Sequence, residues 1–569
     1  MVKEYDYIII GSGFGGSVSA LRLSEKGYKV LVIEKGKWFQ SEDFPKTNWN
    51  LRKWLWMPRL GFYGIMKISA FRHILALSGT GVGGGSLVYA NTLPIPMKGF
   101  YTTGSWGKLA DWQSELKPFY TQALKMLGAA RNPKLYDADK GLLELAKQMG
   151  KEDKFEATDV SVFFGESDKT VVDPYFDGEG PDKTGCTFCG GCMTGCRYGA
   201  KNSLDTNYLY LAQKKGAEIV AEHEVVDVKP NGANDGSEGY IVKAKKVSLF
   251  GKTNEYQAKN VIFSGGVVGT VKLLLKLKQS SLPNLSDKVG DEIRTNNETL
   301  ISVSSLDNET DVSKGVAIGS ILHTDDNSHL EPVRYASGSG FWKILHFPYV
   351  TGSNVLIRLG KLFGKIIFSP ISFFKVYFVN SWSRKTTVLL FMQTIDSTLK
   401  LKKGLFGGLI SRVSTGKKPT AFIPESIELT KGFAKIMNGK ATAMVTDTLV
   451  GIPSTAHILG GAVMGADASK GVIDMNNKVF GYKNMMVCDG AAISANPGVN
   501  PSLSITAISE RAMDKIPRKA DPNRQSKIVN RQSSIKNRQS SIVNRQSKIV
   551  NQKSIINFNT ATISTTLYK

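Results

Sequence analysis

The first part of the chain has the hydrophobic pattern of a parallel α/β unit. Residues 5–10 form a short apolar run, and residues 15–26 place apolar positions at helical spacing directly after a glycine-rich turn. Gly27 ends this predicted helix, and residues 29–34 form a second apolar run that finishes at an acid. The pattern therefore predicts a strand, a tight turn, a helix and a second strand.

Two later regions carry different patterns. Residues 217–228 and 260–276 predict further strands and a helix of the same α/β domain. Between about residues 300 and 410, apolar runs alternate with turns, which is typical of an antiparallel sheet. The fold class that follows is α/β, or α+β for the whole chain.

The first turn has the spacing of a dinucleotide-binding loop, and four of its residues are predicted to bind the cofactor: Gly11, Gly13, Phe14 and Gly16. Its glycines allow the backbone to approach a ligand closely, and the helix that follows directs its N-terminus at a pyrophosphate. Glu34 can accept hydrogen bonds from a ribose. We therefore predict dinucleotide binding here, with either a flavin or a nicotinamide cofactor.

A second run of small residues spans positions 79–86. Such a run brings backbone amides against a ligand, and the predicted contacts are Gly81, Gly83, Gly84 and Ser86. Taken alone, the same run is also typical of a mobile loop.

Charge is distributed unevenly along the 569 residues, which carry a formal net charge of +24. From Arg518 onward there are eleven Lys or Arg and one acid, Asp521, so this part carries +10 and the remainder +14. From Asn523 the sequence repeats with a period of seven, but its apolar residues do not follow coiled-coil spacing. Residues 518–569 therefore predict a disordered repeat tail, for which a tether to nucleic acid or to a membrane is the less favoured interpretation.

The most apolar stretch is residues 362–379, and it is interrupted by Lys365, Pro370 and Lys375. It is too interrupted for a transmembrane helix. An ordinary core segment or a covered loop is the default interpretation, and contact with a membrane surface or the lining of an apolar pocket are the alternatives. No secretory signal precedes the first strand, and four of the five cysteines are clustered. We therefore expect a reducing, cytoplasmic location, with membrane association left open.

The clustered cysteines are Cys186, Cys189, Cys192 and Cys196, spaced as C-x2-C-x2-C-x3-C. This spacing matches a ferredoxin run except that Arg197 stands where proline is usual. Four thiolates so close together predict an iron–sulfur cluster or a structural zinc ion, with free thiols or disulfides as the remaining alternative.

Several motifs together resemble the glucose-methanol-choline (GMC) oxidoreductases, and within them the sterol-oxidising bacterial members. They are the first glycine turn, residues 79–89, 457–465, 487–490 and 499–501, in a region spanning about residues 5–516. The resemblance implies a Rossmann-like FAD-binding domain assembled from residues 1–100, 200–300 and 445–516. It also implies an antiparallel-sheet substrate domain from residues 101–199 and 301–444, in which residues 186–196 form a cysteine-rich insertion.

The resemblance also implies roles for individual residues. FAD would be held by the two glycine segments together with Val225, Asp489, Gly490 and Asn500. His457 would hold or accept a proton from the substrate hydroxyl, because an imidazole titrates near neutral pH. Asn500 would orient substrate and flavin without adding charge. The other five histidines are interpreted as structural: His73, His223, His323, His329 and His346.

Glu331 lies in the sequence His329-Leu330-Glu331-Pro332, which resembles the segment that carries a base for double-bond isomerisation. A carboxylate in an apolar pocket would have a raised pKa, which suits proton shuttling. A surface-loop acid is the alternative interpretation.

The predicted function is FAD-dependent oxidation of a 3β-hydroxysterol, or another apolar alcohol, to the ketone, with isomerisation as a second step. Oxygen or another electron acceptor would reoxidise the flavin. A first alternative is a long-chain alcohol or sugar dehydrogenase of the same superfamily that passes electrons to a quinone. A second is a non-enzymatic flavoprotein scaffold whose basic tail binds nucleic acid, and a third is an NAD(P)H-dependent reductase.

Overall fold

The computed structural model describes residues 3–248, 250–377, 381–404 and 407–520. Residues Met1–Ile516 form one compact unit, and Pro517 begins a second, of which the structure describes residues 517–520. The seven-residue repeat that begins at Asn523 lies outside the described residues.

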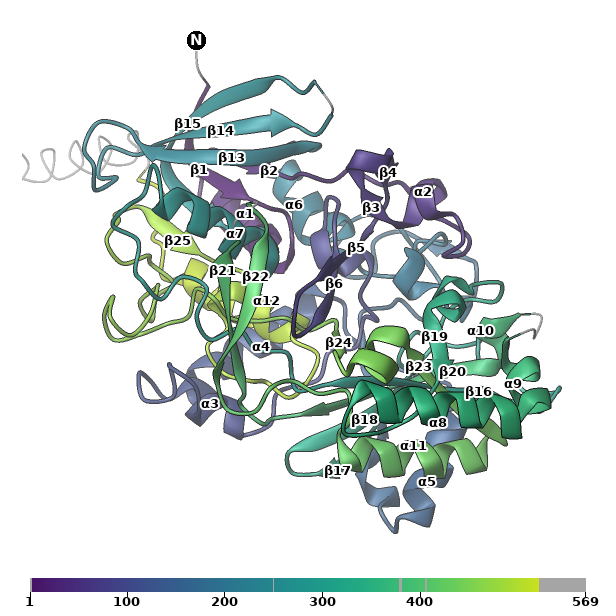
Figure 1. Cartoon of the computed structure of the whole chain (residues 1–569). Helices are drawn as coiled ribbons and strands as arrows, with labels where there is room; N and C mark the ends of the chain where they lie inside the picture. Colours follow the sequence, from purple (N-terminus) through teal and green to yellow (C-terminus); the bar gives the residue numbers. More distant parts are fainter. Residues whose placement is uncertain (1–2, 249, 378–380, 405–406, 521–569) are drawn as a thin grey trace, which may run out of the picture. The chain divides into compact units, whose positions relative to one another are not determined.

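The first sheet has a parallel core to which an antiparallel hairpin is added (Figure 1). Strand β1 (Glu4–Ile10) lies between β2 and β15 and is parallel to both. The long strand β15 also pairs in parallel with β25 and antiparallel with β14. The remaining strands of this sheet are β2 (Val30–Ile33), β12 (Glu218–Val220), β13 (His223–Pro230), β14 (Tyr240–Lys246), β15 (Thr253–Phe263) and β25 (Met485–Val487). The sheet is therefore assembled from segments far apart in the chain, and the predicted α/β class is confirmed.

Helix α1 (Phe14–Glu25) connects β1 and β2, as the opening pattern predicts. It packs against α12 (Ser502–Asp514) and α6 (Tyr208–Lys214), and α12 packs in turn on α4 (Trp112–Met126). Helix α7 (Gly266–Lys278) follows β15 directly and approaches β13. Apart from Glu4, every residue of β1 and β2 is buried, which explains why these two strands appear in the sequence as apolar runs.

The second sheet is entirely antiparallel, in the order β19-β23-β16-β20-β18-β17-β8. Helices α5 (Asp137–Gln148) and α11 (Pro424–Ile436) pack on one of its faces. Its strands are β8 (Phe155–Ala157), β16 (Thr299–Ser305), β17 (Ser320–Asp325), β18 (Ser328–Val333), β19 (His346–Pro348), β20 (Thr386–Gln393) and β23 (Gly439–Met444). This sheet confirms the antiparallel pattern predicted for residues 300–410.

A small three-stranded sheet connects functional segments (Figure 1). It contains β5 (Met66–Ala70), β6 (Leu75–Gly79) and β24 (Ser454–Thr455), and β24 runs parallel to β6. Strand β6 leads into the second glycine segment, whereas β24 leads into His457. The pairing therefore brings together two segments from opposite halves of the chain.

The apolar stretch at residues 362–379 forms parts of two helices, α8 (Val355–Phe368) and α9 (Pro370–Tyr377). Several of its large apolar side chains are exposed, including Phe363, Ile367 and Phe368. The default interpretation as an ordinary core segment is therefore wrong. Among the described residues, no helix combines the length and the apolar character that crossing a bilayer requires.

Candidate functional site

One cavity of about 740 Å³ extends from the glycine turn to the antiparallel sheet. Gly13, Glu34 and Val225 line it at the nucleotide end, and Val333 and Leu390 line it at the other end. His457 and Asn500 also line this cavity. The structure therefore brings the predicted nucleotide-binding loop, His457 and Asn500 to the same space, whereas Glu331, the third predicted catalytic residue, is not among the residues that line the cavity.

The start of helix α1 is suited to an anionic ligand. Gly13 is its N-cap, no side chain caps the helix, and its first turn holds no acid. A Cβ atom at Gly13 would meet no atom within 4 Å, so the backbone here faces open space. Free amides at a helix N-terminus form a binding site for phosphate. These residues fit the diphosphate of FAD.

The second glycine segment packs directly on the first. A Cβ atom at Gly84 would lie 2.7 Å from the Cα of Gly13, and Gly84 has a φ of +53°. Only glycine permits this approach without strain. The two turns therefore form one backbone cradle, of which Gly11, Gly13, Phe14 and Gly84 line the cavity.

The other predicted contacts in these segments support the cradle from behind and are not among the residues that line the cavity. Ser86 donates a hydrogen bond from Oγ to the Gly83 carbonyl (2.7 Å) and accepts one from the Leu204 amide (3.0 Å). A Cβ at Gly16 would lie 2.1 Å from the Gly11 carbonyl oxygen, and one at Gly81 would lie 2.6 Å from Leu87. These residues shape the turn.

Glu34 organises the nucleotide end. Its Oε2 accepts hydrogen bonds from the Ser12 amide (3.1 Å) and hydroxyl (2.9 Å), and its Oε1 accepts one from the Gly36 amide (2.8 Å). The backbone of β13 passes beside it, since the His223 amide donates to the Glu34 carbonyl (2.9 Å). The carboxylate is thus held at the cavity wall beside Val225, where a ribose would lie.

Asp489 and Gly490 line the cavity between α7 and α12. The Asp489 carboxylate accepts hydrogen bonds from the Ala491 amide (2.8 Å) and the Thr270 hydroxyl (2.5 Å). Burial raises the pKa of Asp489 to about 6, against these hydrogen bonds, which lower it. The side chain fixes the turn before α12 and leaves the Gly490 backbone facing the cofactor space.

His457 is paired with an acid that the sequence did not indicate. Its Nδ1 lies 2.5 Å from Oε2 of Glu298, and the Ala456 amide donates to Oε1 of the same carboxylate (2.7 Å). Glu298 precedes β16, whereas His457 follows β24, so the pair joins the antiparallel sheet to the cofactor end. With Nδ1 directed at the carboxylate, Nε2 is the nitrogen that can accept a proton from a ligand.

The electrostatic surroundings of His457 favour its charged form. Burial alone would lower its pKa, but the negative charge of Glu298 and its hydrogen bond, with a further contribution from Glu331, raise the pKa above the usual value. A histidine in such a setting takes up a proton readily near neutral pH.

Asn500 lies against Glu331. Its Nδ2 donates to Glu331 Oε2 at 3.3 Å, and Nε2 of His329 lies 3.5 Å from Glu331 Oε1. The side chains of His329 and Glu331 are both fully buried. Glu331 pairs in register with Leu390 and shares a strand face with Val333, both of which line the cavity. Glu331 is therefore a buried acid on the cavity side of the sheet, and the surface-loop interpretation is wrong.

The face of the antiparallel sheet opposite α5 and α11 supplies an apolar wall. Side chains alternate along a strand, and the residues that reach the cavity include Leu300, Ile318, Val333, Val388 and Leu390, with Tyr335, Trp342 and Met444 beside them. His346 joins this wall, where burial lowers its pKa to about 4. An apolar wall that ends at His457 suits a ligand with a large apolar body and one hydroxyl group.

The lysines that line the cavity were not predicted, and they are Lys35, Lys67, Lys272, Lys276 and Lys403. The charge of Lys35, followed by burial and the charge of Lys272, lowers the pKa of Lys67 to about 7. Mutual repulsion of this kind is relieved by an anion. The cluster gives the nucleotide end a positive charge.

The four clustered cysteines are free thiols, with Cys186 buried and Cys189 exposed. Burial, followed by the charge of Cys192, raises the pKa of the Cys186 thiol. Across the described part of the chain, no three His, Cys, Asp or Glu side chains are grouped so that they could hold a metal ion. The predicted iron–sulfur cluster or zinc ion therefore has no support from the positions of these side chains.

Glu298 and His329 are the functional candidates that sequence reasoning missed. No local motif marks Glu298, because its partner His457 lies 159 residues away. His329 stands two positions from Glu331, so strand alternation places both on one face, a signal that the sequence contained. His223 and His346, interpreted as structural, also line the cavity.

Comparison with known proteins identifies the family. Two GMC oxidoreductase models match residues 180–295 and 421–509, and a model described as an NAD(P)-binding Rossmann-like domain matches residues 9–39. The chain belongs to the GMC oxidoreductase family, and it is an FAD-dependent alcohol oxidoreductase. The predicted family and the predicted FAD-dependent enzyme class are thereby confirmed.

Among its relatives is a cholesterol oxidase from Acinetobacter baumannii, 44% identical over 91% of this chain and 95% of that protein. A cholesterol oxidase from Mycobacterium tuberculosis is 42% identical over 92% of this chain and 93% of that protein. Among solved structures, a pyridoxine 4-oxidase shares 13% identity, with a TM-score of 0.57, over 91% of this chain and all of that chain. The last likeness shows the fold alone.

Proposed function

We propose that this protein oxidises a 3β-hydroxysterol to the 3-ketosteroid, with FAD as cofactor and oxygen as the electron acceptor. The observation that carries the proposal is the single cavity in which an apolar wall, the His457–Glu298 pair and the glycine cradle are continuous. Its volume of about 740 Å³ is within the usual range for small-molecule sites. Identity of 42–44% to two cholesterol oxidases supports the same substrate class.

Each residue of the site has a role in the reaction that follows from its position in the cavity. Gly11, Gly13, Gly84 and Glu34 would hold FAD, which would supply the acceptor for the hydride of the alcohol carbon. Nε2 of His457 accepts the hydroxyl proton, and the nearby Glu298 carboxylate stabilises the imidazolium that forms. Asn500 orients the hydroxyl group through its Oδ1, which has no hydrogen-bond partner in the described residues. The apolar wall excludes water from the alcohol carbon.

The proposal includes isomerisation of the ring double bond by Glu331. This acid is fully buried on the cavity side of β18, and one of its oxygens, Oε1, has no hydrogen-bond partner among the described residues. A carboxylate that can take a proton from one carbon and return it to another needs such a free oxygen. Asn500, held 3.3 Å away, places Glu331 next to the oxidation site.

Anaerobic reduction of the flavin tests the proposal. The purified holoenzyme is mixed under nitrogen with a 3β-hydroxysterol or with a long-chain primary alcohol, and the flavin absorbance is followed. We expect the sterol to bleach the flavin and readmitted oxygen to restore it with release of hydrogen peroxide. The variant His457→Gln should bind FAD yet bleach slowly. Bleaching by the long-chain alcohol and not by the sterol would overturn the proposal.

The long-chain alcohol reading has its own support from relatives. A long-chain-alcohol oxidase from Arabidopsis thaliana is 24% identical over 90% of this chain and 68% of that protein. The apolar wall fits an alkyl chain as well as a sterol, whereas it does not suit a sugar with many hydroxyl groups. The anaerobic comparison therefore separates the two substrates that the cavity favours.

A further inference from the structure

Helices α8 and α9 present an apolar face to solvent. Eight large apolar side chains on them are between 43% and 87% exposed: Val355, Leu356, Ile357, Phe363, Ile367, Phe368, Ile371 and Phe374. Scattered exposed apolar residues are normal, but a continuous group of this size marks an interaction site. Figure 1 shows α8 and α9 together at the edge of the molecule beside the antiparallel sheet, and the two helices are in contact.

The basic side chains of α8 are directed away from this face. Arg358 is buried and donates to the carbonyls of Leu449 (2.9 Å) and Gly352 (2.7 Å). Lys361 donates to the Thr351 carbonyl (2.9 Å) and Lys365 to the Tyr349 carbonyl (2.7 Å). A helix that only had to remain soluble would turn its charges outward. Here the charges anchor the helix to the protein and leave the outer face apolar.

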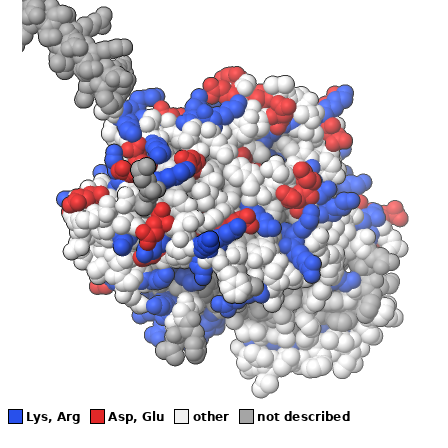
Figure 2. All heavy atoms as spheres, turned by 90° about the horizontal axis from the view of Figure 1, so that it is seen from above, with Lys and Arg blue, Asp and Glu red and all other residues white. Residues whose placement is uncertain are grey.

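All the Lys, Arg, Asp and Glu residues in the segment around these helices are basic ones. Residues 332–395 contain no Asp or Glu and eight basic residues, namely Arg334, Lys343, Arg358, Lys361, Lys365, Lys375, Arg384 and Lys385. Two of these are paired with acids from elsewhere in the chain, Arg334 with Asp139 and Arg384 with Asp311. The space-filling view shows a lobe at its lower right with hardly any red and little blue, at the end of the molecule where α8 and α9 lie (Figure 2). An apolar face on a segment without acids, with Lys361 and Lys365 on the other side of α8, matches a bilayer surface that contains anionic lipids.

The same segment forms part of the cavity wall. Tyr377 of α9 donates a hydrogen bond to the His346 carbonyl (2.5 Å), and His346 lines the cavity. The short helix η7 (Phe341–Leu345) carries Trp342 on the cavity side, whereas Ile344 is 61% exposed. One layer of chain therefore separates the exposed apolar face from the apolar end of the cavity.

We propose that α8 and α9 lie in the surface of an anionic bilayer and place the apolar end of the cavity against the lipid. Docking itself is inferred from the exposed apolar face of α8 and α9, whereas the entry of a sterol from the membrane rests on the proposed function. The helices lie in the plane of the interface, with their apolar side chains among the acyl chains. A substrate with negligible solubility in water then reaches His457 without crossing the solvent.

A second copy of this chain fits the same face less well. Two copies that met through α8 and α9 would bring two acid-free basic segments together, so their charges would repel each other. An anionic bilayer supplies the opposite charge.

Vesicle binding of the holoenzyme tests the docking. The patch variant carries Leu356→Ser, Phe363→Ser and Phe368→Ser, at positions 79%, 61% and 87% exposed. The matched control carries Leu60→Ser, Val172→Ser and Phe250→Ser, at positions 62%, 77% and 95% exposed elsewhere on the protein. On vesicles of phosphatidylcholine and phosphatidylserine without sterol, we expect the patch variant to bind roughly tenfold or more weakly than the control. Equal binding of the two variants would overturn the proposal.

Two further measurements make the result specific. Vesicles of phosphatidylcholine alone should bind the wild-type protein more weakly than vesicles that also contain phosphatidylserine, because they lack anionic headgroups for the basic residues. If light scattering showed that the patch variant dissociates a dimer while its vesicle binding stays normal, the face would be a self-association surface and the proposal would be wrong.

Turnover separates docking from the proposed function. With sterol presented in vesicles, the KM of the patch variant should rise, while its rate with cyclodextrin-solubilised sterol should equal that of the control. If the protein binds sterol-free vesicles through the patch yet oxidises no sterol, the docking stands and the proposed substrate fails. If both variants oxidise vesicle sterol equally well, the patch has no part in substrate delivery.

Discussion

The pairing of His457 with Glu298 determines which proton the histidine can move. Glu298 lies at Nδ1 and also accepts from the Ala456 amide, so the ring is held in one orientation. Its negative charge raises the pKa of His457 against the effect of burial. Glu298 therefore acts as a positioning residue, since it works through the histidine and not on the substrate.

The variant Glu298→Gln should shift the pH profile. The amide keeps a hydrogen-bonding group but loses the charge, so the pKa of His457 should fall. Because His457 must be neutral to accept the proton, activity is lost as the pH falls below this pKa. The acid limb of kcat/KM should therefore move to lower pH, with a lower maximum. Glu331→Gln is the control, since Glu331 makes the smallest of the contributions that raise the pKa. An acid limb that does not move would exclude this role.

Glu331→Gln should also separate the two proposed reactions. Oxidation needs His457 and should continue, whereas double-bond migration needs a group that takes and returns a proton. We expect isomerisation to fall by roughly 100-fold or more, with accumulation of the unconjugated ketone. Absorbance of the conjugated enone and chromatography of the products measure the two rates. Equal loss of both rates would show that Glu331 only supports Asn500.

At this scale the sequence indicated His457, Asn500 and Glu331, because each stands in a recognisable motif. Glu298 stands in no motif, and its role arises only when β16 and β24 bring it to the histidine. His329 was interpreted as structural, although its spacing from Glu331 on a strand predicts a shared face. Local patterns thus identify residues that are used locally, whereas distant partners require the fold.

At the scale of elements, two glycines at the start of helix α1 have different roles. Gly15 lies where the chain packs tightly, because a Cβ there would be 1.6 Å from the Cys488 carbonyl oxygen. Gly13 instead faces open space at the helix N-terminus. The first position serves the fold, and the second serves the ligand.

Alanine variants should distinguish these positions. Gly13 has a φ of −71°, which alanine accepts, so the apoprotein of Gly13→Ala should keep its stability or gain about 0.4–1 kcal/mol. Its FAD affinity should fall by about 1–3 kcal/mol, because the methyl group occupies the ligand's space. Thermal unfolding of the apoprotein and flavin fluorescence titration measure the two effects. Gly15→Ala should lower the melting temperature of the apoprotein, and an unchanged value would contradict the close packing.

The elements themselves were predicted unequally. The parallel strands and α1 were predicted because burial on both sides leaves an unbroken apolar run, and a glycine turn marks the joint. Helices α8 and α9 were not predicted, because a helix with an exposed apolar face has the same composition as a core segment. The sequence gives the apolar character of residues 362–379, and only the structure shows which side faces the solvent.

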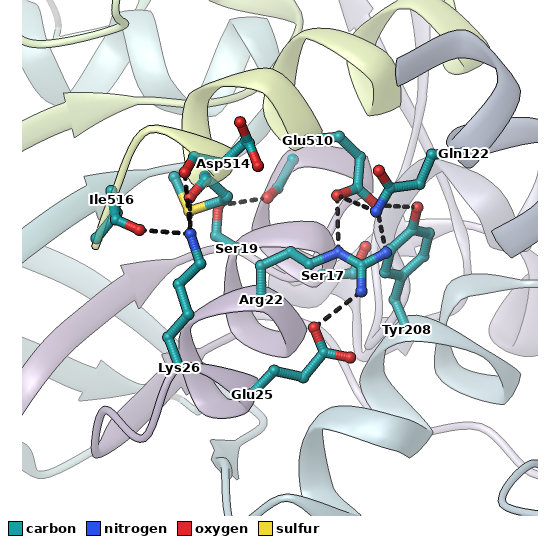
Figure 3. A network of polar contacts seen from close by, with 12 residues as sticks. Ser17, Ser19, Arg22, Glu25, Lys26, Gln122, Tyr208, Glu510, Asp514 and Ile516 are labelled. Carbon is teal, nitrogen blue, oxygen red and sulfur yellow. Dashed lines mark hydrogen bonds and ion pairs between the residues drawn. The ribbon is translucent and has the colours of Figure 1, made fainter. Parts of the chain in front are cut away.

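At the scale of the whole folded unit, one buried carboxylate joins helices from distant parts of the chain (Figure 3). Glu510 of α12 accepts hydrogen bonds from Arg22 of α1 (2.7 and 2.9 Å). It also accepts from Tyr208 of α6 (2.6 Å) and Gln122 of α4 (3.2 Å). Arg22 keeps a second partner, Glu25, at 2.8 Å. The carboxylate thus connects four helices that surround the start of the chain.

The final prediction concerns this connection. Glu510→Gln removes a charge that is 2% exposed and leaves Arg22, which is 15% exposed, with Glu25 as its remaining acidic partner. Breaking a buried ion pair costs about 3–5 kcal/mol, and the remaining partner places the expected loss near the lower end of that range. Urea unfolding of the holoenzyme measures it. The same change at Glu255, whose partner Lys243 lies on the surface, should leave the unfolding midpoint almost unchanged. Equal midpoints for the two variants would mean that packing alone holds α12 to α1, and that Glu510 adds nothing to the attachment of the nucleotide-binding helix.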